Sequence, residues 1–295
     1  MNELTIIIPH YNSSNKLIRL LKSIPDSFGN IGEVIVVDDY SEKEHLKVLN
    51  QTVSKLNYPI KVLKNRDEKG AGNCRNIGID ASDSRWLMFA DSDDYFIDNF
   101  CDNLMQYFNS SWDIVYFRPT SMNEKTKNVG KRHVIYEKLV LNYSHESSNL
   151  FLNKMRFYFV VPWSKLYRSS YIKDNKFYFE NTLVSNDVIF STLSAFETNR
   201  ITCDKSIIYC VTECDESLMG KVTKDRLEIR IEVFLRQVNY VKNKLNQSDL
   251  KKLDINGFRF IKSIIKNRLG IDISIKCIKL LSANKINVFP ISMKR

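Results

Sequence analysis

The sequence Trp86-Leu87-Met88-Phe89-Ala90-Asp91-Ser92-Asp93-Asp94 joins a short apolar run to a cluster of three carboxylates. The apolar run predicts a buried strand, and apolar residues at helical spacing over 97–108 predict a helix after it. The carboxylates therefore follow the C-terminal end of a strand, which is the edge where ligands bind in open α/β sheets.

Asp91 and Asp93 point the same way if the backbone stays extended, because side chains alternate along a strand. Two hard oxygen ligands on one side suit Mg²⁺ or Mn²⁺, with diphosphate oxygens and water completing the coordination. The alternative is an acidic turn in which Asp93 or Asp94 caps the following helix.

Strands and helices alternate through the first ninety residues. Apolar runs predict strands over 4–8, 33–37, 60–63 and 86–89, and helical patterns lie between them, including 41–56 and 70–81. Ser41 is the expected N-cap of the second helix, with Glu44 as its capping-box partner. This order predicts an α/β fold with a mostly parallel, Rossmann-like sheet and helices on both faces.

Polar residues follow three of these strands and suit nucleotide binding. The first strand leads into Pro9, Tyr11 and Asn12, the second into Asp38-Asp39, and the fourth into Asp91 and Asp93. The ends of parallel strands line one crevice, so these segments should meet. The fingerprints GxGxxG and GxxxxGK[ST] are absent, which argues against a typical dinucleotide fold and a P-loop.

The second half of the chain predicts one strand over 112–118, a polar loop over 120–132 and a helix over 188–196. The runs 200–204 and 207–211 are expected to be two paired strands. From residue 221 the pattern is helical, with Leu227, Ile231, Phe234, Leu235 and Val238 on one stripe.

Charge is unevenly distributed along the 295 residues. Residues 221–295 hold 18 Lys and Arg against 6 Asp and Glu, whereas the first 220 residues hold 26 against 28. Six of these cations, Arg259 among them, lie between residues 258 and 281. A basic segment indicates an anionic partner such as a membrane surface, a phosphorylated lipid or a nucleic acid, or else a solvated helical face. Nucleic acid has no support besides this charge, so we expect none.

Targeting and redox signals are few. The six cysteines form no CxxC pair, and we expect all six to be reduced. No signal peptide and no 18-residue apolar run is found in the sequence. The expected location is therefore cytoplasmic, with peripheral binding to the inner face of the membrane as a further hypothesis.

The ordered set of motifs resembles the family 2 glycosyltransferases of the GT-A fold, particularly bacterial enzymes that build surface polysaccharides. The matching segments are Thr5-Ile-Ile-Ile-Pro-His-Tyr-Asn12, Val37-Asp-Asp-Tyr-Ser41, Gly70-Ala-Gly-Asn-Cys-Arg-Asn-Ile-Gly78, Asp91-Ser-Asp-Asp94, Pro162-Trp-Ser-Lys-Leu-Tyr167 and Ser185-Asn-Asp187. Each motif alone is weak, but their order and spacing together are specific.

The resemblance implies a role for each matching residue. On the nucleotide-sugar side it implies Pro9, Tyr11 and Asn12 near the base, Asp38 or Asp39 on uracil, Arg75 on the base or diphosphate, and Asp91 with Ser92 at the ribose. It implies Asp93 as the ligand of Mn²⁺ or Mg²⁺ and Asp187 as the general base. Trp163, Lys165 and Asn186 would shape the sugar and acceptor side.

Some positions depart from the family's pattern. Asn186-Asp187 replaces the usual acidic pair, so only Asp187 can act as the base, and its alternative role is helix capping. Tyr40 replaces a common glycine, which predicts a turn that avoids positive φ there. Two explanations are open for His10, a donor contact or space filling, and two for Trp163, a place in the site or in the core.

The implied reaction is inverting transfer of a sugar, most often from a UDP-sugar, to a hydroxyl of a glycan or lipid-linked oligosaccharide in O-antigen, capsule or lipooligosaccharide synthesis. The expected domains are a GT-A catalytic unit over 1–220, divided into a nucleotide-sugar half (1–118) and an acceptor half (119–220), and a basic helical segment over 221–295. The alternatives are a catalytically degenerate nucleotide-sugar-binding protein and a sugar nucleotidyltransferase. The latter class needs a Gly-rich, arginine-bearing loop after the first strand, where this chain has Pro9-His10-Tyr11-Asn12.

Overall fold

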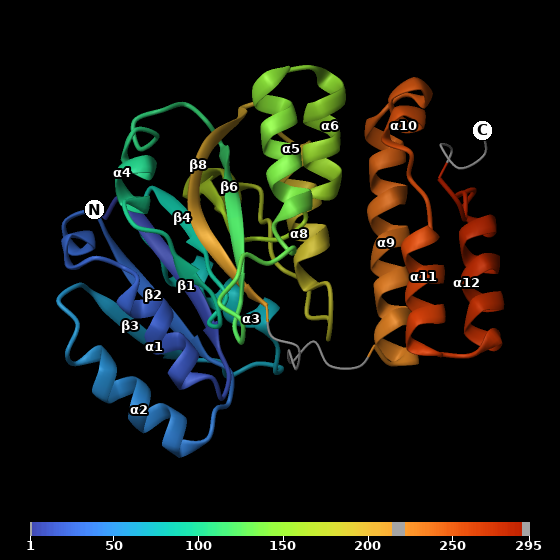
Figure 1. Cartoon of the computed structure of the whole chain (residues 1–295). Helices are drawn as coiled ribbons and strands as arrows, with labels where there is room; N and C mark the ends of the chain where they lie inside the picture. The colour runs from blue at the N-terminus through green and yellow to red at the C-terminus, as the bar shows by residue number, and fades with distance from the viewer. Residues whose placement is uncertain (1, 214–221, 291–295) are drawn as a thin grey trace.

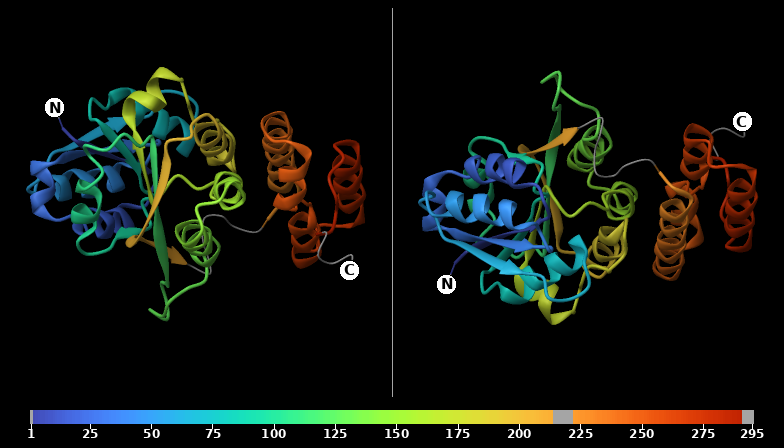
Figure 2. Two further views of the ribbon diagram at one scale, coloured as in Figure 1. Left: turned by 90° about the horizontal axis from the view of Figure 1, so that it is seen from above. Right: turned by 90° about the horizontal axis from the view of Figure 1, so that it is seen from below.

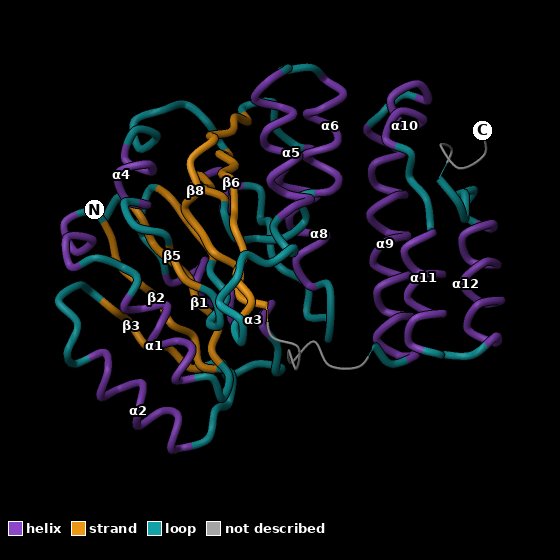
Figure 3. The backbone as a smooth tube through the Cα atoms, in the orientation of Figure 1, coloured by secondary structure: helices purple, strands orange, loops and turns teal. Residues whose placement is uncertain are grey.

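A computed structural model describes residues 2–213 and 222–290. Its described strands form one eight-stranded sheet in the order β3-β2-β1-β4-β7-β6-β8-β5. Figure 3 shows these strands as one layer with helices around it. The expected α/β fold with helices on both faces is confirmed: α1 and α2 lie on one face and α3 lies on the other (Figure 1).

The N-terminal half is built from parallel strands joined by helices. Its elements are β1 (Leu4–His10), α1 (Ser14–Lys22), η1 (Asp26–Asn30), β2 (Gly32–Asp38), α2 (Lys43–Val53), β3 (Ile60–Lys64), α3 (Ala71–Ala81), β4 (Trp86–Phe89), β5 (Tyr95–Phe96) and α4 (Phe100–Met105). β1 pairs in parallel with both β2 and β4, and β1, β2 and β4 are buried along their whole length. Gly78 allows α3 to lie against β1, because a Cβ there would come within 2.3 Å of Ile7 Cγ2.

The second half makes the sheet mixed. Its elements up to residue 213 are β6 (Ile114–Asn123), α5 (Val134–His145), α6 (Asn149–Tyr158), β7 (Lys165–Arg168), α7 (Ser169–Asp174), α8 (Asn186–Phe196) and β8 (Ile201–Glu213). β7 runs antiparallel to β4 and β6, and β5 runs antiparallel to β8, whereas β6 and β8 are parallel.

Several local predictions were wrong. The two strands expected over 200–204 and 207–211 are one strand, β8. Its pairing with β6 shifts register between Phe117 and Arg118, and residues 205 and 206, which separated the two expected strands, lie at this shift. The expected loop over 120–132 begins as strand, because β6 continues to Asn123. Ser41 does not cap α2, whose N-cap is Glu42. Tyr40 adopts φ 62°, so the turn after β2 does take positive φ without a glycine.

The C-terminal helices are α9 (Lys224–Lys244), α10 (Gln247–Leu253), α11 (Phe258–Asn267) and α12 (Ile271–Ala283). The predicted apolar stripe of α9 is confirmed as buried, and it belongs to a second hydrophobic core that also takes in Phe157 of α6. Figure 2 shows α5, α6 and α8 between the sheet and these helices. The predicted domain boundary at 220/221 lies outside the described residues, as does Cys214; the other five cysteines are free.

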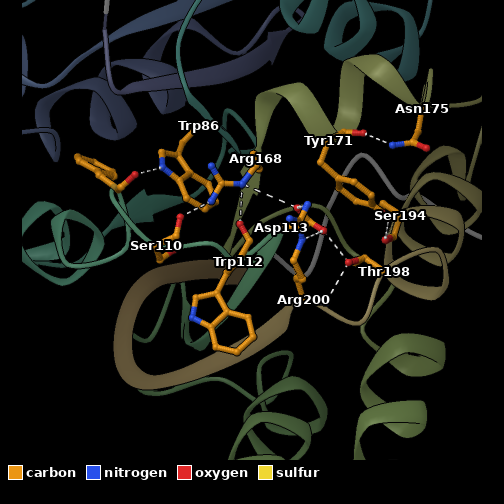
Figure 4. A network of polar contacts seen from close by, with 11 residues as sticks. Trp86, Ser110, Trp112, Asp113, Arg168, Tyr171, Asn175, Ser194, Thr198 and Arg200 are labelled. Atoms are coloured by element: carbon orange, nitrogen blue, oxygen red, sulfur yellow. Dashed lines mark hydrogen bonds and ion pairs between the residues drawn. The ribbon is translucent and has the colours of Figure 1, made fainter.

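A buried carboxylate ties β6, β7 and β8 together at one end of the sheet (Figure 4). Asp113, just before β6, lies 2.6 Å from Arg200 Nη2 and accepts a hydrogen bond of 2.6 Å from Thr198 Oγ1. Arg168 at the end of β7 contributes a longer ion pair of 3.8 Å and covers the ring of Trp86. These contacts fix the mutual register of the strands on which the acceptor half is built.

Candidate functional site

The carboxyl ends of β1, β2 and β4 meet at one edge of the sheet, as predicted from their sequences. A cavity of about 1010 Å³ lies there. Its lining includes most of the predicted site residues: Pro9, Tyr11, Asn12, Asp39, Arg75, Asp91, Ser92, Asp93, Trp163, Asn186 and Asp187. Segments separated by almost two hundred residues therefore share one cavity.

The loop after β1 is held against the loop after β2. The Asn12 backbone N–H donates to Ser41 Oγ at 3.0 Å, and Asn12 Oδ1 accepts from the Glu42 N–H at 2.8 Å. Ser41 and Asn12 thus join two loops, which explains why Ser41 is not a helix cap. The neighbouring Tyr11 is exposed, with Lys69 Nζ 3.4 Å from the centre of its ring.

Asp38 and Asp39 have different surroundings, although both are buried. Asp39 lines the cavity, and its Oδ1 accepts hydrogen bonds from Asn65 Nδ2 and from the Gly70 N–H. Asp38 is not part of the cavity lining, and its Oδ2 accepts from the Ser41 N–H at 3.2 Å. Of this pair, Asp39 is therefore the carboxylate positioned to meet a ligand in the cavity.

Arg75 of α3 connects the two acidic segments of the site. Its Nη2 lies 2.6 Å from Asp91 Oδ1, and its Nη1 donates to Asn186 Oδ1 at 2.9 Å. Gly72 allows α3 to lie against the backbone of Glu180, because a Cβ at this position would come within 2.3 Å of Glu180 O. The guanidinium also stacks over Phe179, which fixes its plane.

Asp91, Asp93 and Asp94 divide between the cavity and the protein interior. Asp94 is buried, and it accepts hydrogen bonds from Tyr209 Oη and the Thr212 N–H at 2.8 and 2.7 Å. Tyr209 Oη in turn accepts from the Asp91 N–H at 2.8 Å. Asp94 is therefore a structural residue that positions the turn, whereas Asp91 and Asp93 face the cavity. Neither Asp93 nor Asp94 caps α4, which begins after Asn99.

The surroundings of Asp93 disfavour the negative charge of its carboxyl. Burial raises the pKa of its carboxyl, and the charge of Asp91 raises it further, while Lys16 and Arg132 oppose the increase. Two carboxylates that disfavour each other's charge fit a divalent cation, and Mg²⁺ commonly binds one or two carboxylates together with substrate phosphates. Within the described residues no group of three or more metal-ligating side chains occurs, so such an ion would depend on ligands from a bound substrate.

Asp187 lies in the first turn of α8 and lines the cavity, and the N-cap of that helix is Ser185. The alternative prediction that Asp187 caps this helix is therefore wrong. Burial raises the pKa of the Asp187 carboxyl to about 6, against the opposing charge of Arg75. A carboxylate with a pKa near neutral pH is suited to accept a proton.

Lys165 does not take the predicted position on the sugar side. It is fully buried and outside the cavity lining; its Nζ donates to Phe159 O at 2.6 Å and lies near the rings of Tyr116 and Phe159. Burial lowers the pKa of this ammonium well below its ordinary value. Trp163 is buried, lines the cavity and stacks on Tyr209 with 5.7 Å between the ring centres, so it belongs to both the core and the cavity wall.

The motifs did not predict several cavity residues. His10, left open between a donor contact and space filling, is buried and lines the cavity beside Ser13, with an Nδ1–Oγ distance of 3.1 Å. Arg132, Tyr136, Arg230 and Arg259 also line it, although they come from the predicted loop, α5 and the C-terminal helices. For Arg230 and Arg259 the excess of cations in the C-terminal segment was the sequence signal, and no motif indicated Arg132 or Tyr136.

Comparison with known families and proteins gives concordant results. The family described as "Glycosyl transferase family 2" matches residues 5–175, which is more than half of the chain. Poly(ribitol-phosphate) beta-N-acetylglucosaminyltransferase TarS of Staphylococcus aureus is 27% identical over 214 residues, covering 71% of this chain and 35% of TarS. The chain therefore spans about a third of the length of that relative.

Two further similarities concern the fold and a shorter relative. UDP-Glc:alpha-D-GlcNAc-diphosphoundecaprenol beta-1,3-glucosyltransferase WfgD of Escherichia coli is 27% identical over 143 residues, which cover 47% of this chain and 55% of WfgD. The crystal structure of S. aureus TarS 1–349 in complex with UDP-GlcNAc superimposes with a TM-score of 0.70 and 20% identity, covering 96% of this chain and 80% of that one. At this identity the superposition establishes the fold alone.

Proposed function

Because the chain belongs to glycosyl transferase family 2, we propose that it transfers a sugar from a UDP-sugar to a hydroxyl of a glycan or lipid-linked acceptor, with inversion at the anomeric carbon. The observation that carries this proposal is the convergence of Asp91, Asp93 and Asp187 on one cavity. Burial raises the pKa of the Asp187 carboxyl to about 6, and a carboxyl with a raised pKa that faces a cavity is typical of catalytic acids and bases.

The donor would occupy the sheet edge. Tyr11 offers an exposed ring for stacking on a base, and Asp39 offers a carboxylate for the uracil N–H. Asp91, fixed by Arg75, would bind the ribose, with Ser92 beside it. The name of WfgD, which begins with UDP-Glc, and the UDP-GlcNAc complex of TarS support UDP as the nucleotide.

The reaction requires a proton acceptor and a stabilised leaving group. The acceptor hydroxyl gives its proton to Asp187 as its oxygen attacks the anomeric carbon, and the bond from that carbon to the diphosphate oxygen breaks. The hydroxyl attacks from the face opposite the diphosphate, which gives inversion. Asp93 would hold a Mn²⁺ or Mg²⁺ ion together with donor phosphates, and the ion would offset the charge of the departing diphosphate. Asn186 orients Arg75 next to this centre.

The proposal also covers the kind of glycan that accepts the sugar and the place in the cell where the transfer occurs. The name of TarS gives poly(ribitol-phosphate) as its acceptor and that of WfgD gives GlcNAc-diphosphoundecaprenol, and these acceptors support a role in surface-polysaccharide synthesis such as that of O-antigen, capsule or lipooligosaccharide. No helix among the described residues has the length and apolar character to span a bilayer. We propose that the chain works in the cytoplasm and docks peripherally on the inner face of the membrane through its basic C-terminal segment.

A panel of UDP-, GDP- and dTDP-sugars tests the donor by thermal stabilisation with and without Mn²⁺. A ligand at 100 times its Kd stabilises the folded state by about 2.7 kcal/mol, so the correct donor should raise Tm by several degrees. The sugars that bind are then tested for donor hydrolysis. Equal, negligible shifts with every nucleotide sugar would contradict the proposal, and binding without turnover would favour the catalytically degenerate alternative.

A further inference from the structure

The C-terminal helices form one wall of the cavity that contains the predicted catalytic residues. α9 contributes Arg230, Val233 and Phe234, and α11 contributes Arg259 and Ser263. α9 packs against α8, the helix that carries Asp187, as the adjacent ribbons in Figure 1 show. The basic segment therefore reaches the reaction centre directly, and its role is not limited to the outer surface.

Two cations of this wall have no carboxylate partner. Other cations of the C-terminal helices do form ion pairs, for example Arg236 with Glu180 and Lys276 with Glu228. Across residues 2–213 and 222–290, neither Arg230 nor Arg259 forms a salt bridge. Burial lowers the pKa of both guanidinium groups, and the charge of Arg230 lowers the pKa of Arg259 further.

The guanidinium of Arg259 is held in place by aromatic rings. Its carbon lies 4.5 Å from the centre of the Phe234 ring and 4.8 Å from that of Phe260. Aromatic contacts fix the plane of a guanidinium and leave its N–H groups free to donate. Two positive groups that repel each other in a cavity cost folding free energy, and a bound anion removes that cost.

The donor diphosphate is not the best candidate for this anion. The cations that act on Asp93 are Lys16 and Arg132, so the diphosphate already has positive neighbours at the sheet edge. The charge of Arg230 acts on Arg259, the charge of Arg226 acts on Arg230, and Arg259 lies near Tyr136 and Tyr158. The helical wall therefore adds a second group of cations to the same cavity.

We propose that Arg230 and Arg259 bind a phosphate group of the acceptor and thereby select phosphate-bearing acceptors. The inference rests on the proposed glycosyltransferase function and names the acceptor class for that site. The phosphate could belong to a polyol-phosphate chain or to the diphosphate of a lipid-linked sugar. Arginine recognises both, because its N–H groups match pairs of phosphate oxygens.

The test measures anion binding with the donor site filled. The full chain is saturated with UDP and Mn²⁺, and then titrated separately with a ribitol-phosphate oligomer, a short-chain GlcNAc-diphospho-lipid and the neutral octyl GlcNAc glycoside. Arg230→Gln and Arg259→Gln remove one cation each, Arg259→Lys keeps the charge, and Lys266→Gln is the control, since Lys266 is exposed on α11 outside the cavity.

We expect one of the two phosphate compounds to bind the UDP-saturated protein, and the neutral glycoside to bind weakly. Each arginine-to-glutamine change should lower the affinity for the phosphate compound about 10-fold or more, as expected for the loss of a hydrogen bond to a charged group. Arg259→Lys should keep part of the affinity that Arg259→Gln loses. Lys266→Gln should leave the affinity unchanged. The compound that binds identifies the source of the phosphate.

Two results would overturn the inference while leaving the proposed function intact. One is UDP binding with no phosphate compound bound by the UDP-saturated protein. The other is equal affinity in wild type, Arg230→Gln and Arg259→Gln. Failure of UDP itself to bind would instead contradict the proposed function. KM for the accepted compound, measured against kcat, provides a second readout: KM should rise and kcat should change little.

Discussion

Arg75 lies 2.6 Å from Asp91, and the same buried guanidinium donates a hydrogen bond of 2.9 Å to Asn186, the residue before Asp187. The same guanidinium opposes the burial-driven rise in the pKa of Asp187. The positive charge of Arg75 on α3 therefore affects the protonation of Asp187 on α8.

Replacing Arg75 with methionine should shift the pH dependence of transfer. Without the cation, the pKa of Asp187 should rise above its present value of about 6, so the acid limb of the kcat/KM profile should move to higher pH. Loss of the charged contacts should also lower activity about 10-fold or more. Arg75→Lys, which retains the charge, should show a smaller shift. An unchanged acid limb in Arg75→Met would contradict this coupling.

Asp187→Asn should lower transfer by about 10²–10⁴-fold, because the variant lacks the proposed proton acceptor. UDP binding, measured by thermal shift, should remain close to wild type, since the change removes no proposed donor contact. In the wild type, activity should fall as pH decreases through about 6, where Asp187 takes up a proton. An Asp187→Asn enzyme with nearly wild-type turnover would remove this residue from the mechanism.

The sequence predicted the features that depend on local order. Parallel strands end at one edge, so the convergence of Pro9, Asp39 and Asp91 followed from strand positions alone. Packing between distant elements was not predictable in this way. Lys165 shares its motif with Trp163 but is turned into the core, and Arg259 reaches the cavity only because α11 packs on α9. Helical spacing predicts which face of a helix is buried, but it does not predict which element packs against that face.

Asp93 provides a test of the proposed metal. A chelator should abolish transfer, and added Mn²⁺ should restore it. Asp93→Asn should require a higher Mn²⁺ concentration for half-maximal activity, because an amide is a poorer ligand for a hard cation than a carboxylate. Asp83→Asn, at an exposed position, serves as the control. Full activity of the wild type in excess chelator would exclude a required divalent ion.

Asp113 should make a large contribution to stability. Asp113→Ala leaves Arg168 without its buried carboxylate and removes the bond from Thr198, so we expect a loss of about 3–5 kcal/mol in the free energy of unfolding. Arg200→Gln leaves Asp113 its hydrogen bond from Thr198 and its contact with Arg168, and glutamine can still donate to the carboxylate, so the loss should be smaller than in Asp113→Ala. Urea denaturation measures both changes. Similar losses in the two variants would contradict a specific role for the buried carboxylate.

The outer face of α12 provides the test of membrane docking. Ile271, Ile275 and Ile278 recur at helical spacing and are 43–78% exposed, and Lys279 follows them on the same helix. α12 lies at the edge of the molecule farthest from the sheet (Figure 1). An exposed apolar stripe beside cations is typical of helices that lie in the membrane interface.

The full chain should therefore bind vesicles that contain anionic lipid, and binding should weaken as salt rises, since each cation near such a surface contributes about 1 kcal/mol. Replacing Ile271, Ile275 and Ile278 together with serine should reduce binding about 10-fold or more, because each buried CH₂ contributes about 0.8 kcal/mol. Val129→Ser, at an exposed residue in the N-terminal 213 residues, should have no effect. Equal binding to neutral and anionic vesicles would remove the electrostatic part of the proposal, and unchanged binding by the triple variant would show that α12 is not the docking face.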